Sequence, residues 1–134
     1  MQIQQMIAAH PDVQGNLNPA LVRCIEECLA CGQACTSCAD ACISEESVAH
    51  LRQCIRLNLD CADVCFATAR LATRRTGGNV AALKAMLTAC RSACELCAAE
   101  CREHDAMEHC RVCAECCERC RDACQAAASS LSTQ

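Results

Sequence analysis

The chain has 134 residues, which suits one domain with a buried core, and its formal net charge at pH 7 is −4. Lys and Arg residues are scattered rather than clustered, which argues against a nucleic-acid-binding surface. No uninterrupted apolar run approaches the roughly 20 residues that a membrane-spanning helix needs. We therefore expect neither nucleic acid nor a membrane among the partners of this chain.

Cysteine takes the place of the large aliphatic residues in this composition. Only 23 residues are Leu, Ile, Val or Phe, whereas 19 are Cys. In a secreted chain this cysteine content would indicate a disulfide scaffold. Here the number of cysteines is odd, and the segment from Met1 to Ala9 has neither the basic nor the apolar region of an export signal. We therefore expect reduced thiols and a cytoplasmic location.

Capping signals place a short helix and then a long one at the start of the chain. The segment from Met1 to Ala9 is amphipathic and is closed by a His-Pro pair. Asn18 followed by Pro19 is typical of a helix start, because Asn caps free N–H groups and Pro fits the first turn. We expect this long helix to run to about Ile43.

Three further helices are expected after it. Ser44 is predicted to cap a second long helix that runs to about Arg75, because two glutamates follow Ser44 where the helix dipole favours negative charge. The sequence Thr-Gly-Gly-Asn at 76–79 then breaks the helix. The third long helix is expected from about Val80 to Glu103, and the fourth from about Ala106 to Ala128.

These elements predict an all-α fold, an antiparallel four-helix bundle with a cysteine-lined core and a short N-terminal helix. Residues 1–18 would form the short helix and a loop, 19–128 the bundle, and 129–134 a frayed tail. Hydrophobic residues such as Leu57, Val64 and Leu71 are expected to face outward, where they leave room for association between helix faces.

The cysteines recur every three or four residues, which places them in one row along each long helix. The rows are Cys24, Cys28, Cys31, Cys35, Cys38 and Cys42; Cys54, Cys61 and Cys65; Cys90, Cys94, Cys97 and Cys101; and Cys110, Cys113, Cys117, Cys120 and Cys124. Asn58 fills the position in the second row where the rhythm asks for another cysteine, and Cys116 flanks the fourth row. We expect all four rows to face the bundle axis.

The spacing within a row suits a bridging metal ion better than a disulfide. Residues three or four apart on a helix have Cβ atoms about 5–6 Å apart, whereas a disulfide requires about 3.5–4.5 Å. With metal–sulfur bonds near 2.3 Å, as for zinc, a linear sulfur–metal–sulfur unit spans about 4.6 Å. A core of small thiols without metal would also be under-packed.

Copper(I) is the metal that the pattern favours. Soft thiolates select copper(I), zinc or iron–sulfur clusters. When each thiolate bridges two copper(I) ions, the cluster holds about one copper per cysteine and is nearly neutral, so its burial costs little. Zinc requires four ligands in a tetrahedron, and an isolated four-thiolate site keeps a negative charge.

One local motif matches an iron–sulfur spacing, C-x2-C-x2-C-x3-C, at Cys110, Cys113, Cys116 and Cys120. Arg121 stands where that motif expects proline, and the surrounding pattern is continuous helix. We therefore treat this match as coincidental. No catalytic constellation or phosphate-binding loop is evident, so we expect storage rather than enzymatic turnover.

The two ends of the predicted bundle differ in chemistry. Leu21, Leu83 and Leu87 would plug one end with aliphatic packing. The other end would gather cysteines with His104, which continues the third row three residues after Cys101. We expect copper to enter at this second end, with His104 and Asn58 as accessory ligands, and the roles of His50, Met107 and His109 there stay open.

The cysteine rows on four helices, without an export signal, resemble the bacterial cytosolic copper storage proteins, the non-exported branch of the Csp family. The resemblance covers about 19–128. It implies a four-helix bundle that fills with Cu(I) along its axis, self-association as a homotetramer and a role in holding copper safely in the cytosol. It also implies the row cysteines as ligands, with Asn58 and His104 as accessories, and Cys116 fits this pattern least well.

Two other functions stay open from the residues alone. A zinc-buffering protein would use the same thiolates, and copper(I) would displace its zinc. A structural or redox bundle would take up little metal and would lose thiols on mild oxidation. The sequence does not identify the partner that unloads copper, for which a copper chaperone or a copper-requiring acceptor is the expected class.

Overall fold

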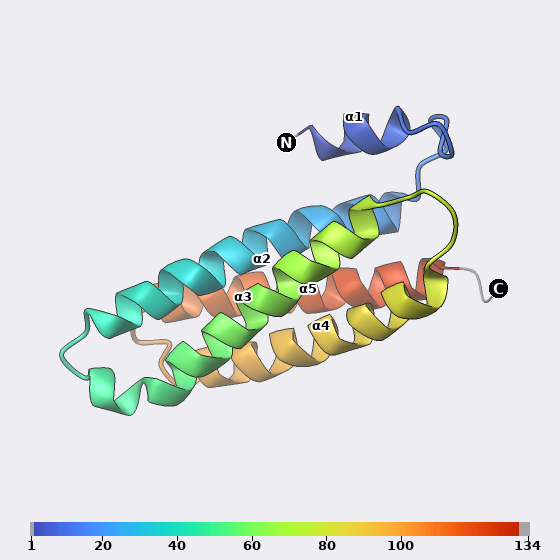
Figure 1. Cartoon of the computed structure of the whole chain (residues 1–134). Coiled ribbons are helices and arrows are strands. Elements are labelled where there is room, and N and C mark those ends of the chain that lie inside the picture. The colour runs from blue at the N-terminus through green and yellow to red at the C-terminus, as the bar shows by residue number, and fades with distance from the viewer. Residues whose placement is uncertain (1, 132–134) are drawn as a thin grey trace.

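The computed structural model describes residues 2–131, and within that range the only regular structure is helical (Figure 1). The elements are α1 (Ile3–Ala8), α2 (Pro19–Ile43), the short 3-10 helix η1 (Val48–His50), α3 (Arg52–Thr73), α4 (Val80–Arg102) and α5 (Glu108–Ser130). No helix in this part of the chain is long and apolar enough to cross a membrane.

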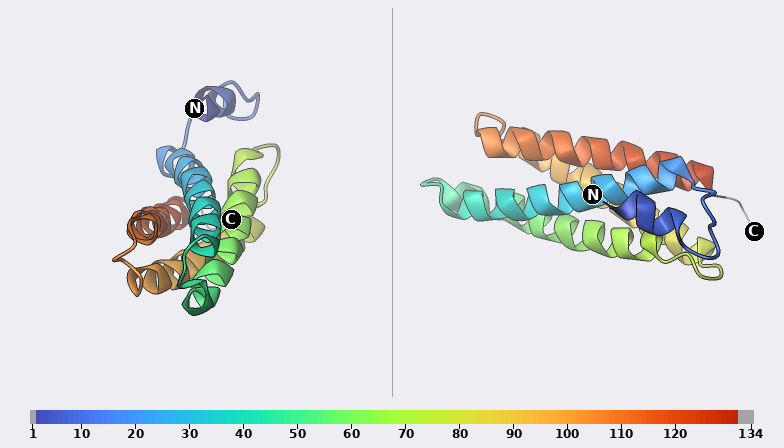
Figure 2. Two further views of the ribbon diagram at one scale, coloured as in Figure 1. Left: turned by 90° about the vertical axis from the view of Figure 1, so that its left-hand side faces the viewer. Right: turned by 90° about the horizontal axis from the view of Figure 1, so that it is seen from above.

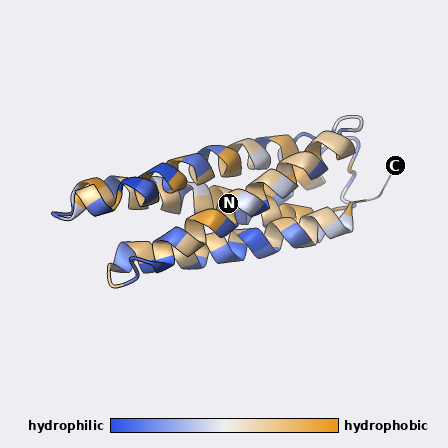
Figure 3. Ribbon diagram, turned by 90° about the horizontal axis from the view of Figure 1, so that it is seen from below, coloured by the Kyte–Doolittle hydropathy of each residue, from blue (hydrophilic) through white to orange (hydrophobic). Residues whose placement is uncertain are grey.

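The four long helices form an antiparallel bundle, which confirms the fold class predicted from the sequence. Helix α2 packs against α3 and α5, and α4 packs against the same two helices, so the four surround a common axis. Figure 2 shows this arrangement nearly end-on in its left view and from the side in its right view, with α1 outside the bundle beside the start of α2. Each long helix carries hydrophobic and hydrophilic residues on different sides (Figure 3).

Local signals account for the start of α2 and for the turn between α3 and α4. The side-chain oxygen of Asn18 accepts a hydrogen bond from the Leu21 N–H at 3.2 Å, and Pro19 occupies the first turn, as predicted. Gly77 has a φ of +67°, a left-handed conformation that glycine adopts without strain. The breaker at 76–79 therefore ends one helix and allows the next to start at Val80.

The predicted start of the second long helix at Ser44 is wrong. The chain turns after Ile43, forms η1, and only enters α3 at Arg52. Cys42 and Cys54 are both fully buried at the two sides of this connection, so the chain must reverse direction between them. Leu51, which is 1% exposed, is drawn into the core by that reversal. Tertiary packing thus overrides the capping signal at Ser44.

Smaller differences concern the last helix and the outward residues. Helix α5 starts and ends two residues later than predicted, so the first two residues of the expected tail 129–134 are helical, and the last three lie outside the described residues. Leu57, Val64 and Leu71 are half-buried and pack against the core, so they do not form an outward apolar face. The exposed hydrophobic residues of α2 and α3 are instead Ile43, Leu59 and Phe66.

Candidate metal centre

The four cysteine rows converge on the bundle axis. Of the 19 cysteines, all except Cys116 are buried, and none of the 19 forms a disulfide. They share their core with few large side chains, since Ile25, Leu51, Leu83 and Leu87 are the fully buried aliphatic ones among the described residues. The sulfur atoms therefore fill the space that leucine or isoleucine would occupy in an ordinary bundle.

Contacts between thiols join the helices through the middle of the bundle. Within α2, the sulfur atoms of Cys31 and Cys35 lie 3.8 Å apart. The sulfur atom of Cys117 on α5 lies 3.6 Å from the sulfur atom of Cys35. The Cys65 sulfur of α3 lies 3.8 Å from that of Cys90 on α4 and 3.9 Å from that of Cys120 on α5. These separations are van der Waals contacts, well beyond the roughly 2.05 Å of a disulfide bond.

Several sets of four donor atoms are close enough to surround a metal ion, with every atom within 4.8 Å of the others. Each set draws on at least two helices, and some share members. They include Cys28, Cys90, Cys120 and Cys124; Cys31, Cys61, Cys65 and Cys94; Cys31, Cys35, Cys61 and Cys117; Cys35, Cys97, Cys113 and Cys117; and Cys38, Cys42, His109 and Cys110. The sharing of thiols suits clusters of bridged ions rather than isolated sites.

Asn58 lies fully buried among the thiols, as its place in the second row predicted. Its side-chain N–H group donates to the Cys54 carbonyl oxygen at 2.9 Å and to the Cys54 sulfur at 3.4 Å. Its side-chain oxygen accepts from the thiols of Cys113 at 3.0 Å and Cys97 at 3.2 Å. This amide therefore links α3, α4 and α5, and its oxygen loses two hydrogen-bond donors when those thiols give up their protons.

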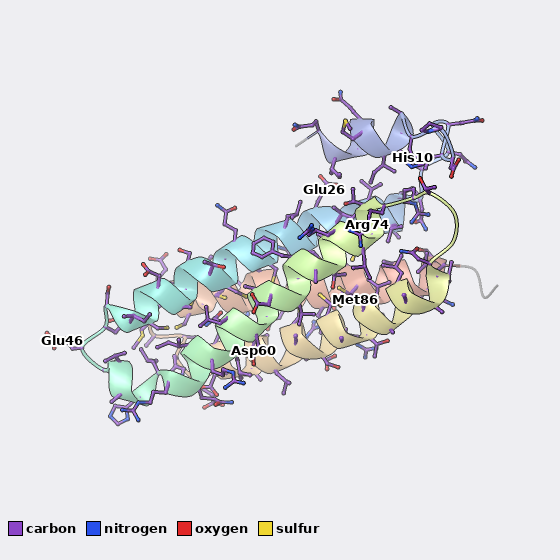
Figure 4. All side chains as sticks on the ribbon, in the orientation of Figure 1. His10, Glu26, Glu46, Asp60, Arg74 and Met86 are labelled. Carbon is purple, nitrogen blue, oxygen red and sulfur yellow. The ribbon has the colours of Figure 1, made fainter. Side chains whose placement is uncertain are left out.

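Aliphatic side chains close one end of the bundle, as the sequence predicted. Leu21, Leu83 and Leu87 are 3%, 1% and 1% exposed, and Ile25 is buried beside them. We call this region, defined by these four residues, the plugged end. It lies toward Arg74, Met86 and His10 in Figure 4, whereas Glu46 marks the opposite end, where α2 turns toward α3.

The opposite end, which we call the open end, is defined by Cys38, Cys42, Glu45, His109 and Cys110. The His109 Nδ1 atom lies 3.4 Å from the Cys38 sulfur and 3.6 Å from the Cys110 sulfur. Its Nε2 atom lies 2.8 Å from a carboxylate oxygen of Glu45. His109 is therefore the histidine that the structure places with the thiols.

His109 is one of the residues whose role at this end the sequence leaves open. It is adjacent to Cys110, the first cysteine of its row, but adjacency does not reveal which side chain reaches a neighbouring helix. The partner Cys38 lies 71 positions earlier in the chain, so only the packing of α2 against α5 brings the two together.

The other histidines and Met107 are placed differently. His104 is half-buried, its Nε2 atom lies 2.9 Å from a Glu100 carboxylate oxygen, and it has no hydrogen bond to a thiol among the described residues. Met107 is half-buried and packs against the core, and His50 is exposed. By their positions, His109 is a better candidate than His104 for a metal-ligating side chain at the open end.

Cys116 stands apart from the array, in keeping with its position beside the fourth row. Its side chain is half-buried, and its sulfur accepts a hydrogen bond from the Arg119 guanidinium at 3.1 Å. Burial raises the pKa of this thiol, and the nearby Arg119 charge opposes that effect. None of the four-donor sets given above includes Cys116.

Burial keeps the thiols at the open end protonated at neutral pH in the absence of metal. Desolvation raises the pKa of Cys42 to about 11, and desolvation followed by repulsion from neighbouring thiolates raises the pKa of Cys110 to about 12. A metal ion must therefore displace protons when it binds these sulfur atoms.

Comparison with known proteins agrees with this geometry. A copper storage protein of Streptomyces lividans, Ccsp, loaded with 10 copper equivalents, has 50% sequence identity to this chain and a TM-score of 0.92, over 96% of this chain and 99% of that one. A structure of a cytosolic copper storage protein from the same organism with five coppers has 54% identity and a TM-score of 0.83, over 85% and 96% of the two chains.

An uncharacterised cysteine-rich protein of Bacillus subtilis (strain 168), YhjQ, is 37% identical over 92 residues, which are 69% of this chain and 81% of that protein. The family model described as copper storage protein, Csp, matches residues 17–129, which include every cysteine of the chain. This chain therefore belongs to the Csp family of copper storage proteins, and the resemblance noted from the cysteine rows is confirmed.

Proposed function

We propose that this protein stores copper as Cu(I), with many ions bound by thiolates along the axis of the bundle. The observation that carries the proposal is the buried array of thiols in mutual contact, which draws on all four long helices. A single metal site would need only four of these residues. The number of buried thiols is explained if metal ions are bound along the whole axis of the bundle.

Charge balance favours Cu(I) over zinc in this core. The polar groups of the buried region are thiols, the neutral amide of Asn58 and the hydroxyl of Thr68, without a buried cationic side chain among the described residues. One Cu(I) per bridging thiolate gives a nearly neutral cluster, whereas a four-thiolate zinc site would leave negative charge in a low-dielectric interior. We therefore propose a capacity of about one copper ion per buried cysteine.

The proposed ligands are the buried cysteines, with His109 at the open end and the oxygen of Asn58 in the middle of the array. Asn58 is included because loading removes the thiol protons that its oxygen accepts in the metal-free protein. Cys116 and His104 are left outside this set, since neither has a hydrogen bond to a buried thiol among the described residues.

We further propose that the protein acts in the cytosol as a store without turnover, and that a copper chaperone or a copper-requiring acceptor exchanges metal at the open end. The open end supports the second point, because its thiols lie beside the half-buried His109 and Glu45. We also propose a homotetramer, in which the exposed Ile43, Leu59 and Phe66 of α2 and α3 provide apolar surface for association.

The test is an anaerobic titration of the reduced, metal-free protein with Cu(I) in the presence of a chromogenic chelator. We expect uptake approaching one copper per buried cysteine before the chelator competes. A matched pair of variants sharpens the result. Cys65→Ser removes a sulfur that contacts α4 and α5 and should lower the capacity by about one ion, whereas Cys116→Ser should leave it unchanged.

Uptake of only a few ions, or equal losses in the two variants, would contradict a filled core. The same titration, started from protein loaded with zinc, separates the zinc-buffering alternative. Cu(I) should displace zinc completely, and zinc should not displace Cu(I). Size-exclusion chromatography with light scattering measures the proposed tetramer independently of metal uptake.

A further inference from the structure

A carboxylate reaches across the open end of the bundle to the histidine that faces the thiols. Glu45 follows α2, and its Oε2 atom lies 2.8 Å from Nε2 of His109 in the first turn of α5. The turn that carries Glu45 is held by its own backbone, because the Glu45 N–H donates to the Cys42 carbonyl and the Glu45 carbonyl accepts from the Val48 N–H, both at 3.2 Å. The Glu45 side chain thus starts from a fixed position.

This contact determines which ring nitrogen of His109 carries the proton. An ionised carboxylate can only accept hydrogen bonds, so the Nε2 atom that faces Glu45 must be the donor. In the neutral ring the Nδ1 atom then keeps its lone pair. That lone pair faces the thiols of Cys38 and Cys110, at 3.4 Å and 3.6 Å.

We propose that Glu45 is a positioning residue for copper binding at the open end. Its carboxylate holds the His109 ring in the Nε2–H tautomer and in the orientation that presents Nδ1 to an ion shared with Cys38 and Cys110. This inference rests on the proposed copper-storage function. The arrangement corresponds to the carboxylate–histidine pairs that orient metal-binding histidines in other proteins, where loss of the partner typically weakens metal binding by about 10–100-fold.

A simple ion pair between α5 and the turn that follows α2 does not account for the arrangement, because such a pair places no demand on the second ring nitrogen. The chain contains a comparison for this point. His104 and Glu100 form a similar pair at 2.9 Å, four residues apart on α4, and the ring of His104 has no hydrogen bond to a thiol among the described residues. The two pairs share the carboxylate–imidazole contact and differ in what the other nitrogen faces.

The experiment compares Glu45→Ala with Glu100→Ala in the full chain. Long-range proton–nitrogen NMR spectra of the reduced, metal-free protein report the tautomer of each histidine. Cu(I), supplied anaerobically from a chromogenic chelator, is then added in steps, and the copper concentration that shifts the His109 Nδ1 resonance is recorded. Total copper capacity is measured on the same samples.

In the unsubstituted protein we expect His109 as the Nε2–H tautomer. Glu45→Ala should populate the other tautomer. It should also raise, by about tenfold, the copper concentration at which the His109 Nδ1 resonance shifts. Glu45→Gln, whose amide oxygen can still accept from Nε2–H, should restore most of both properties. Glu100→Ala should change neither, and the total capacity should stay within about one ion in all three variants.

The proposal is overturned if Glu45→Ala leaves the tautomer and the copper response of His109 unchanged, or if Glu100→Ala alters His109 to the same extent. Should Glu45→Ala perturb the fold, as seen by circular dichroism, Glu45→Met replaces it in the same comparison, because this side chain keeps a similar length but offers Nε2–H no carboxylate. Failure of the unsubstituted protein to take up copper would instead contradict the proposed function, and the tautomer of the metal-free protein would still report the effect of Glu45.

Discussion

The plugged end and the open end close the same bundle with different chemistry. At the plugged end Leu21, Leu83 and Leu87 bury aliphatic side chains, which need no partner beyond close packing. At the open end Cys42 and Cys110 are equally buried, but they pack as protonated thiols beside the half-buried pair of His109 and Glu45. The plugged end therefore stabilises the metal-free protein by aliphatic packing alone, whereas the thiols at the open end would lose their protons on the metal binding that we propose.

Removing aliphatic packing at the plugged end should destabilise the metal-free protein strongly. Leu87→Ala should lower the free energy of unfolding of the metal-free protein by about 2–5 kcal/mol, because it leaves a cavity in a core that has few other large side chains. Chemical denaturation under reducing conditions, followed by circular dichroism, measures the change.

Leu96→Ala on the same helix is the matched control, since Leu96 is 59% exposed. It should change the free energy of unfolding by no more than about 0.5 kcal/mol. Equal effects at the two positions would mean that the plugged end does not carry the stability of the metal-free bundle.

A smaller effect should appear at alkaline pH and should arise at the open end. Thiols in the unfolded chain ionise near pH 9.0, whereas burial raises the pKa of Cys42 to about 11 and that of Cys110 to about 12. The folded protein binds these protons more tightly, so their stabilising contribution is complete below pH 9 and is lost as the pH rises toward 11–12.

Between pH 8 and pH 10 we expect the metal-free protein to lose about 2.7 kcal/mol of unfolding free energy from these two thiols, because each contributes roughly one pKa unit over this interval at about 1.4 kcal/mol for each unit. Anaerobic denaturation at the two pH values measures the loss, and Cys42→Ser should reduce it. Stability that increases over this interval would show that the buried thiols ionise more readily than free ones.

The smallest effect concerns how the helices start at the two ends. The side chain of Asn18 caps α2 at the plugged end, whereas α4 at the same end and α3 and α5 at the open end start without a side-chain cap. Asn18→Ala should therefore cost about 1 kcal/mol of unfolding free energy, and Asn18→Asp should retain most of the cap. Asn16→Ala, two residues earlier in the loop, is the control, and a loss of the same size there would argue against capping as the cause.

Most of the fold prediction rested on the periodicity of the cysteines. The steps of three and four residues between cysteines place each row on one face, and a bundle is the simplest way to bury four such faces. Asn18, Pro19 and Gly77 then set local boundaries through backbone chemistry that needs no distant partner. The start of α3 escaped prediction because the burial of Leu51, on the far side of a chain reversal, outweighed the local signal at Ser44.

For the candidate metal centre too, some features followed from the sequence and others did not. That the row cysteines and Asn58 would be buried together followed from the sequence, because the 3-4 spacing is a property of a single helix. Which donors meet across helices did not follow, because contacts such as that between Cys38 and His109 depend on the axial register of α2 and α5. A shift of one turn, about 5.4 Å, would separate such pairs.

The all-helical class, the cysteine-lined axis and the preference for a soft metal could therefore be predicted from the sequence, since each depends on residue type and on spacing within one helix. The packing of the helices against one another is what places His109 rather than His104 with the thiols and brings Glu45 into contact with His109. Those features depend on distances between helices, which packing of the whole core establishes and no local pattern encodes.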